Sequence, residues 1–376
     1  MPPAAGTLAA MALQVGIVGL PNVGKSTLFN AVSAAGAEAA NYPFATIEPN
    51  LGVVAVPDER LDALVGLAKS QRRVPTTVEF LDIAGLVKGA STGEGLGNQF
   101  LSHIQAVDAI CHVVRCFEDD DIVHVDGSVD PARDIEVIST ELLLKDLEIV
   151  TKRVERATKT ARSGDKPAVR AAEVFGQIQA HIESGNPVRT FPVDPEYVKE
   201  VGELGLLTAK PVLYAANVAE ADLPDGIGNP HVEVVREIAA SEGAQMVVIS
   251  AEAEAQIAEL DEEERAEFLS DLGLKRSGLD KLITAAYELL GLLTFFTAGE
   301  KEARAWTVRK GATAPVAAGK IHSDIQQGFI RANTISYEDY VARGGEQGAK
   351  EAGKLRQEGK DYVVVDGDVI LFLHSG

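Results

Sequence analysis

Near its amino end the chain reads Gly19-Leu20-Pro21-Asn22-Val23-Gly24-Lys25-Ser26-Thr27. The apolar residues 13–18 before this stretch predict a short strand, and residues 26–32 after it predict the start of a helix. A strand, a loop of the pattern G-x-x-x-x-G-K-S/T and a helix in this order are typical of a phosphate-binding loop. The sequence therefore predicts a nucleoside triphosphate as ligand.

The residue types of this loop fit the chemistry of a triphosphate. Gly19 and Gly24 let bare backbone wrap the phosphates, and the helix N-terminus aims its N–H groups at them. Lys25 is placed to reach the β and γ oxygens, and the Ser26 hydroxyl is placed to bind Mg²⁺. A chance match in a glycine-rich loop is the alternative, and the strand and helix on either side argue against it.

Length and composition are those of a globular protein with more than one domain. The chain has 376 residues, 46% hydrophobic and 24% charged, enough for two or three domains with their own cores. Its two cysteines, Cys111 and Cys116, make neither a metal nor a disulfide framework, which favours a reducing compartment. No apolar run reaches the length of a membrane span, and no Lys or Arg precedes Lys25 as a signal peptide would require. These features predict a cytoplasmic protein with no membrane contact, in which residues 1–10 are an extension and Met11 is an alternative start.

The net charge of −21 argues against general coating of nucleic acid, because contacts to phosphates need cations on the binding face. Residues 151–170 differ from the rest, since they hold seven cations against two anions, Glu155 and Asp165. The cations are Lys152, Arg153, Arg156, Lys159, Arg162, Lys166 and Arg170. This basic island is either a contact for nucleic acid or a solvated helical surface.

Short apolar strands alternate with helical patterns over the first part of the chain. This alternation indicates βαβ units and a mainly parallel sheet, the mark of an α/β domain. Strands are predicted near 14–19 and 51–56, at 77–82, at 109–115, at 211–216 and at 245–250, with helices from 25 and near 97–106.

Between these strands the pattern changes to long charged helices. From Pro131 to Arg162 apolar residues recur every three or four positions, and after a turn at 163–167 a second such helix follows. Two helices joined so closely predict an antiparallel hairpin, and a third helix near 194–204 leads back to the sheet. After residue 293 the pattern predicts a small α+β module, and Asp366-Gly367 predicts a tight hairpin.

Two further motifs indicate a switch protein. The predicted strand 77–82 runs into Asp82-Ile83-Ala84-Gly85, a D-x-x-G pattern in which Asp82 holds Mg²⁺ through water and the Gly85 N–H senses the γ-phosphate. In the loop 41–50, Thr46 is the candidate second ligand of Mg²⁺, with an ordinary surface threonine as the alternative. The predicted metal residues are therefore Ser26, Thr46 and Asp82.

The base-binding motif is altered. Asn217-Val218-Ala219-Glu220 follows a predicted strand where guanine-binding switch proteins carry Asn-Lys-x-Asp, whose Asp accepts from guanine N1–H and the 2-amino group. Adenine has an acceptor at N1, which repels a carboxylate aimed at it, whereas the longer Glu220 side chain can turn away. The sequence therefore favours ATP over GTP, and Ser250-Ala251-Glu252 after the next strand is the remaining candidate base-supporting loop.

Together with Gly93-Glu94-Gly95-Leu96-Gly97-Asn98-Gln99-Phe100, these motifs closely resemble the YchF subfamily of Obg-like P-loop proteins over nearly the whole chain from Met11. The resemblance implies a Ras-like nucleotide domain at 11–133 and 208–292, a coiled-coil arm at 134–207 and a TGS domain at 293–376. It also implies an ATP preference. By position, it implies phosphate contacts from Asn22, Val23, Gly24, Lys25, Ser26 and Thr27, and adenine contacts from Asn217 and Val218.

The resemblance further implies a slow ATPase that works as a switch on the ribosome, with the large subunit as partner and RNA contacts from the arm and the TGS domain. Cations of the last domain, Lys301, Arg304, Arg309, Lys310, Lys320 and Arg331, would add to those of the arm. The alternative is a protein- or RNA-binding module with a structural nucleotide. A small-molecule kinase is disfavoured, because no second substrate pocket is suggested.

One residue departs from Ras-type GTPases, which carry Gln directly after the Gly of D-x-x-G. This chain has Leu86 there, which cannot orient a water by a hydrogen bond, so slow hydrolysis is expected. His124 matches the position of a histidine implicated in the family and is the candidate to position the water; the alternatives are a non-catalytic loop histidine, His103 and His112. Asn22 matches a phosphate-loop Asn that binds K⁺ in some relatives, which makes K⁺ a candidate second cofactor.

Overall fold

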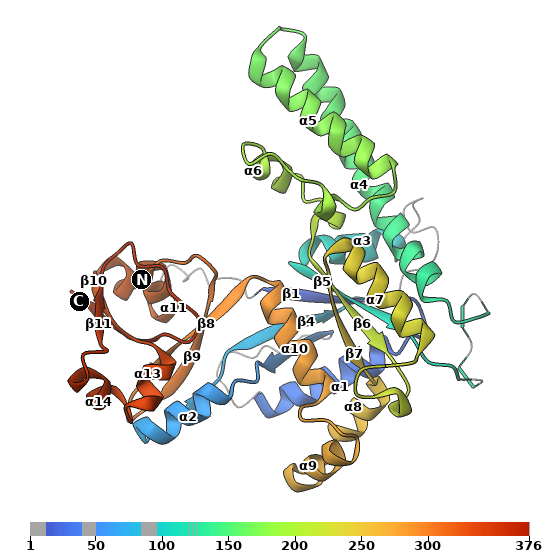
Figure 1. The fold of residues 1–376 in the computed structure, drawn as a ribbon. Coiled ribbons are helices and arrows are strands. Elements are labelled where there is room, and N and C mark those ends of the chain that lie inside the picture. The colour runs from blue at the N-terminus through green and yellow to red at the C-terminus, as the bar shows by residue number, and fades with distance from the viewer. Residues whose placement is uncertain are drawn as a thin grey trace, which may run out of the picture.

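The computed structural model describes residues 13–39, 50–83, 96–119, 121–122, 124–125 and 127–375. It has three parts: a central sheet domain, two long helices that project from it, and a second sheet domain (Figure 1). The predicted α/β class with a helical insertion and a C-terminal α+β domain is confirmed. The extension 1–10 and the candidate residues Thr46, Gly85 and Leu86 lie outside the described residues.

The first sheet is parallel except at one edge, where β2 runs antiparallel to β4. In spatial order its strands are β2 (Leu51–Ala55), β4 (Thr77–Asp82), β1 (Gln14–Val18), β5 (Ala109–Arg115), β6 (Val212–Asn217) and β7 (Gln245–Ile249). All seven residues of β5 are buried, as expected for a parallel strand covered on both faces. The carboxyl ends of these parallel strands meet at one edge, which therefore carries the loops of the predicted site.

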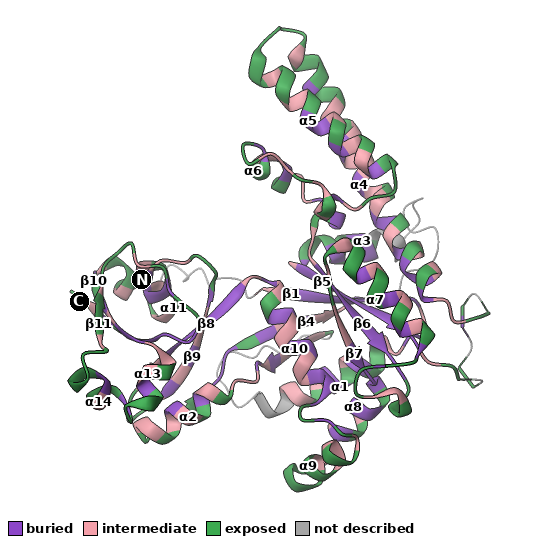
Figure 2. Cartoon of the chain, viewed as in Figure 1, coloured by how far each residue is buried: buried purple, intermediate pink, exposed green. Residues whose placement is uncertain are grey.

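Helices cover this sheet and complete its core (Figure 2). They are α1 (Lys25–Ala39), α3 (Leu96–Ala106), α7 (Pro230–Glu242), α8 (Ala251–Ile257) and α10 (Gly278–Leu289). α9 (Glu262–Asp271) follows α8 and buries none of its residues. Apolar residues of α1, α3, α7 and α10 join those of the strands in a single buried cluster. No helix in the described part of the chain has the length and apolar character needed to cross a membrane.

The predicted helical hairpin is confirmed and projects as an arm (Figure 1). Its elements are α4 (Pro131–Ala161), α5 (Lys166–Glu183), α6 (Val198–Gly202) and the 3-10 turns η2 (Val188–Thr190) and η3 (Leu207–Ala209). α4 begins where the Asp130 side chain accepts from the Arg133 N–H and Pro131 takes the first helical position. It ends one residue earlier than predicted, with Arg162 as its cap.

α4 belongs to two cores. Ile135, Ile138 and Leu142 near its start pack into the core of the first sheet, whereas Val150 and Ala157 pack against α5. Between them lies Asp146, fully buried, whose carboxylate accepts from the backbone N–H groups of Leu207 and Thr208 at 2.7 and 2.8 Å. This anchor ties the returning chain to α4 at the base of the arm.

The second sheet forms the C-terminal domain. In spatial order its strands are β11 (Arg356–Glu358), β10 (Phe329–Ile335), β12 (Val369–His374), β8 (Leu292–Ala298), β9 (Ala303–Arg309) and β3 (Arg73–Val74). Its helices are α11 (Ala314–Ile321), α12 (Ser323–Gln327), α13 (Tyr337–Ala342) and α14 (Glu346–Glu351). The domain carries eleven Lys and Arg residues against eleven Asp and Glu from residue 293 on, so the acidic excess of the chain lies elsewhere.

The predicted hairpin at Asp366-Gly367 is wrong in its pairing. The turn forms, with Gly367 at φ 88°, but 363–365 makes only an isolated bridge from Val363 to Thr313. β12 pairs instead with β10 and β8. The Asp366 carboxylate accepts from the Thr294 N–H at 2.8 Å, so the turn is attached to β8.

A segment from the first part of the chain joins this second domain. α2 (Glu59–Ala68) buries Leu61 and Leu64 against residues of the C-terminal domain such as Phe296, and β3 pairs in parallel with β9. No element was predicted there, because the segment completes a sheet far along the chain. The predicted boundaries at 133 and 293 stay a prediction, and residues 59–74 pack with the second sheet.

Candidate nucleotide-binding site

The predicted phosphate loop connects β1 to α1. Asn22 and Gly24 adopt left-handed backbone conformations, with φ of 62° and 90°. Asn tolerates this region better than other side chains, and Gly24 also has a second reason: a Cβ there would collide with the Asn217 amide. Ser26 and Thr27 are exposed in the first turn of α1, where helix N–H groups have no intrahelical partner. The loop therefore presents hydroxyls and N–H groups to solvent, as phosphate binding requires.

Asn217 fixes the phosphate loop from its buried side. This side chain is 3% exposed; its Nδ2 donates to the Val23 carbonyl at 2.9 Å and its Oδ1 accepts from the Ala251 N–H at 2.9 Å. It joins the phosphate loop, the end of β6 and the start of α8. The sequence predicted Asn217 as a base contact and did not reveal this bracing role, because the two partners lie far from it along the chain.

Asp82 ends β4 next to the phosphate loop, where Ile17 of β1 is its register partner. Its Oδ1 is buried and has no hydrogen-bond partner among the described residues. Burial raises the pKa of Asp82, and the nearby Lys25 ammonium partly opposes this rise. An unsatisfied carboxylate oxygen beside a lysine at a phosphate loop fits a site for a hydrated divalent cation.

The predicted base-binding residues lie at the ends of β6 and β7. Val218 is 2% exposed, and its N–H donates to the Ile249 carbonyl at 2.9 Å. The Ser250 hydroxyl caps α8 by accepting from the Ala253 N–H at 3.4 Å. Glu220 is exposed in the 3-10 turn η4 (Glu220–Asp222). The strand ends thus bring Asn217, Val218 and Ser250 together, with Glu220 free of the core.

His124 lies buried at the base of the arm. Its Nε2 is 2.8 Å from Asp134 Oδ2, and the two side chains are 4% and 2% exposed. His103 is exposed on α3. His112 is buried in β5 beside Tyr214, and burial together with Arg189 lowers the pKa of His112 to about 3, so it is a neutral core residue as its apolar strand suggested.

Two residues near His124, Arg115 and Asp134, have structural roles that sequence reasoning missed. Arg115, at the end of β5, is 1% exposed and donates to the carbonyls of Phe117, Ile122 and Asp119 at 3.1, 2.9 and 3.2 Å. It thereby shapes the loop that leads to His124. Asp134 is the other. The only sequence signal for either was a charged residue within an apolar pattern.

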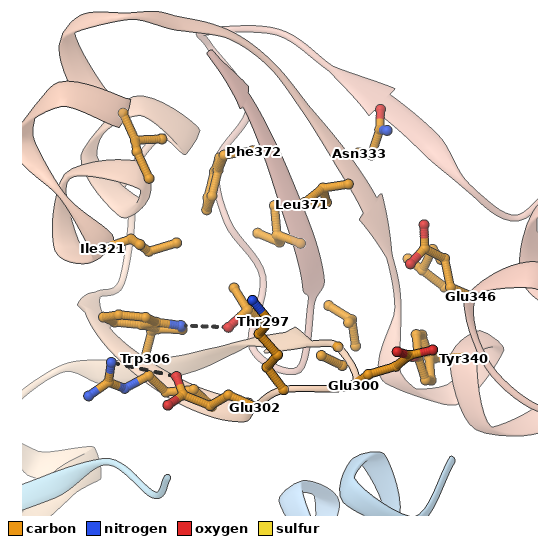
Figure 3. A pocket seen from close by; sticks show the side chains of 18 of the residues that line it. Thr297, Glu300, Glu302, Trp306, Ile321, Asn333, Tyr340, Glu346, Leu371 and Phe372 are labelled. Atoms are coloured by element: carbon orange, nitrogen blue, oxygen red, sulfur yellow. Dashed lines mark hydrogen bonds and ion pairs between the residues drawn. The ribbon is translucent and has the colours of Figure 1, made fainter. Parts of the chain in front are cut away.

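A groove of about 720 Å³ lies in the C-terminal domain (Figure 3). β8 and β12 pair at one position, Phe296 with Val369, and then diverge. Trp306 lies on one wall and donates to Thr297 Oγ1 at 2.9 Å, and Tyr340 lies on the other. None of the residues predicted for the nucleotide site lines this groove. The nucleotide site is therefore identified by the residues at the sheet edge and not by the volume of a cavity.

Family models match both sheet domains. A model described as "50S ribosome-binding GTPase" matches residues 14–152. A model for the C-terminal part of YchF-type GTPases, described as "Protein of unknown function (DUF933)", matches residues 292–375. One match therefore lies in the N-terminal part of the chain and the other covers its C-terminal domain.

Full-length relatives agree with these matches. "Ribosome-binding ATPase YchF" of Bacillus subtilis is 59% identical over 362 residues, 96% of this chain and 99% of that protein. "Obg-like ATPase 1" of Rattus norvegicus is 45% identical over 364 residues, 96% of this chain and 92% of that protein. The solved YchF GTPase structure of Schizosaccharomyces pombe is 41% identical, with a TM-score of 0.87 over 96% of this chain and 97% of that one. The chain therefore belongs to the YchF family of Obg-like ATPases.

Proposed function

We propose that this chain binds ATP with Mg²⁺ and hydrolyses it slowly, as a switch that responds to the ribosome in the cytoplasm. The observation that carries the proposal is the phosphate loop held by Asn217 beside Asp82, whose Oδ1 has no hydrogen-bond partner among the described residues. The names of the relatives add ATP and the ribosome, and the altered base motif agrees with ATP.

Ser26, Thr46 and Asp82 are the residues that would hold Mg²⁺, Asp82 through water. When bound, the ion would screen the charge of the phosphates. Lys25 adds its own positive charge, and the Gly85 N–H is assigned to the γ-phosphate. Asn22 is assigned to K⁺ as a second cation.

Base preference follows from two side chains, and exchanging them tests it. Val218→Lys together with Glu220→Asp rebuilds the guanine-binding pattern and is expected to shift the ratio of ATP to GTP affinity toward GTP by about tenfold. Competition binding of the two nucleotides measures the ratio.

Because Val218 is 2% exposed, thermal unfolding of the double variant must be followed in parallel. Glu220→Asp alone, at an exposed position, is the matched control for folding. A wild-type chain that already prefers GTP would overturn the argument from adenine N1.

The arm tip offers the best-defined surface for an RNA partner. Three cations of the basic island are neutralised: Lys152 pairs with Glu148, Arg153 with Glu200, and Arg170 with Glu173 and Asp194. The other four are exposed, and no ion pair engages them within the described part of the chain: Arg156, Lys159, Arg162 and Lys166. These four lie at the end of α4 and the start of α5, which makes the outer end of the arm the cationic one.

Reversing this charge is expected to weaken ribosome binding. Lys159→Glu with Arg162→Glu should lower co-sedimentation with ribosomes by about tenfold at low salt, and the difference should shrink as salt rises. ATP turnover without ribosomes should stay at the wild-type rate. Lys145→Glu with Lys152→Glu makes the same charge change lower on α4, at two lysines already paired with Glu148, and is the control. Equal loss in both variants would assign the effect to total charge.

The alternative function is a ribosome-, RNA- or protein-binding module whose nucleotide is structural. One observation favours it: the candidate catalytic histidine is buried against Asp134. Steady-state ATPase with and without ribosomes, and ribosome co-sedimentation with ATP, ADP or no nucleotide, separate the two. Turnover that ignores ribosomes, with binding that ignores the nucleotide, would support the binding module.

A further inference from the structure

The start of the arm helix engages both ring nitrogens of His124. Asp134 Oδ2 lies 2.8 Å from Nε2, and Arg133 Nη2 lies 3.5 Å from Nδ1. Arg133 Nη2 also donates to Asp134 Oδ1 at 3.2 Å, so each of the three side chains contacts the other two. Arg133 and Asp134 both belong to the first turn of α4, whose far end carries the exposed cations of the arm tip.

The partners of the ring define which nitrogen carries the proton. A carboxylate accepts, so Nε2 is the donor; a guanidinium donates, so Nδ1 is the acceptor. A histidine that orients a water for attack needs an acceptor nitrogen, and here that nitrogen is Nδ1. The Arg133 guanidinium occupies the position from which a water would reach it.

We propose that Asp134 is a positioning residue for hydrolysis, which keeps the proton of His124 on Nε2 and Nδ1 as the acceptor, and that Arg133 covers Nδ1 until the base of the arm moves. This inference rests on the proposed function, since it names how that site is controlled. It connects the first turn of α4 to the loop that carries His124 through three contacting side chains. A carboxylate that fixes the orientation and tautomer of a histidine is a recurrent arrangement in enzymes.

The packing of these side chains explains why the arm would act on them. Asp134 is 2% exposed and lies one residue before Ile135, which packs in the core of the nucleotide domain. The Arg133 side chain is 30% exposed and also donates to the hydroxyl and the carbonyl of Ser128, at 3.2 and 2.5 Å. A shift of the loop at Ser128, which precedes α4, can therefore move the guanidinium while the carboxylate, on the packed helix, stays in place.

The first test compares turnover in two backgrounds. Asp134→Asn is expected to lower kcat about 10- to 100-fold with KM for ATP unchanged. In a His124→Ala background the same change should lower kcat no further, whereas a merely structural Asp134 would reduce turnover in both. Asp134→Glu, which keeps the carboxylate, should recover part of the rate. Equal losses in the two backgrounds would overturn the proposal.

The second test does not depend on turnover. Nitrogen-15 spectra of the histidine rings, assigned with His124→Ala, should show the proton of His124 on Nε2 in the wild type and a changed distribution in Asp134→Asn. A proton on Nδ1 in the wild type would overturn the proposal even if Asp134→Asn failed to fold. A wild-type chain without ATP turnover would overturn the proposed function instead, and the ring spectra would still decide the contact with Asp134.

A third variant tests whether Arg133 covers Nδ1 of His124. Arg133→Ala is expected to raise kcat without ribosomes by a few fold and to reduce the further increase that ribosomes cause, because the covered state is removed. The matched control is Arg170→Ala, an arm arginine paired with Glu173 far from His124, which should leave basal kcat as in the wild type. A lower kcat in Arg133→Ala would show that the guanidinium supports His124 and would contradict the cover.

Discussion

Replacing Asn217 with Ala is expected to weaken ATP binding about 10- to 100-fold, because the phosphate loop loses the side chain that fixes it. The Val23 carbonyl and the Ala251 N–H are the two groups that would lose their partner. Each unsatisfied buried group costs about 1–3 kcal/mol, so the free energy of unfolding should fall by about 2–6 kcal/mol. Calorimetric titration with ATP and chemical denaturation measure the two effects.

A second buried asparagine separates affinity from stability. Asn229 is 9% exposed, caps α7 and donates to the Cys116 carbonyl at 2.8 Å, and none of its hydrogen bonds reaches the phosphate loop. Asn229→Ala should therefore destabilise the chain with a much smaller loss of ATP affinity. Asn217→Asp keeps the acceptor for Ala251 but turns a carboxylate oxygen toward the Val23 carbonyl, so it should weaken ATP as much as Ala does. Normal affinity in Asn217→Asp would show that the Val23 bond is dispensable.

Replacing His124 with Ala is expected to lower kcat about 100-fold while ATP affinity stays near that of the wild type. The physical reason is the loss of the group assigned to orient the attacking water, at a position where Leu86 offers no hydrogen bond. Single-turnover hydrolysis and equilibrium ATP binding separate the chemical step from affinity.

The matched control for His124 is another buried histidine. His112→Ala removes a ring of similar burial from β5, next to Tyr214, and among the described residues no hydrogen bond joins His112 to His124. It should reduce stability without a comparable fall in kcat. Unchanged turnover in His124→Ala would remove that residue from the mechanism, and equal falls in both variants would point to a structural cause.

Much of the fold could be predicted from the sequence, because the signals are local. The strands 77–82 and 109–115 were predicted with the bounds that the structure shows, since apolar runs between turn residues mark buried parallel strands. The arm was predicted to within one residue at its first helix, because Pro131 and the spacing of apolar residues mark its start and length. The two elements that the sequence did not predict, α2 and β3, are short. The residues that they contact, in β8 and β9, lie more than two hundred positions further along the chain.

The candidate site likewise has residues that the sequence predicted and contacts that it did not. The phosphate loop, Asp82 and Asn217 each carry a short motif after an apolar strand, and parallel strands bring their carboxyl ends to one edge. The contacts of Arg115, Asp134 and Asn217 could not be predicted, because a charged or amide residue in an apolar pattern does not reveal its partner. The pairing of β12 was missed for a related reason: a turn signal gives the bend and not the neighbour of the strand that follows.

Local patterns of the chain were enough to predict a phosphate-loop protein with a helical arm and a small C-terminal domain, because periodicity and motif spacing are properties of neighbouring residues. Only tertiary packing decided which distant parts of the chain contact one another. Asn217 meets Val23 across 194 residues, β3 completes a sheet formed by the last part of the chain, and His124 is buried against the first turn of the arm. Such contacts depend on which surfaces exclude water together, and only the folded chain brings those surfaces into contact.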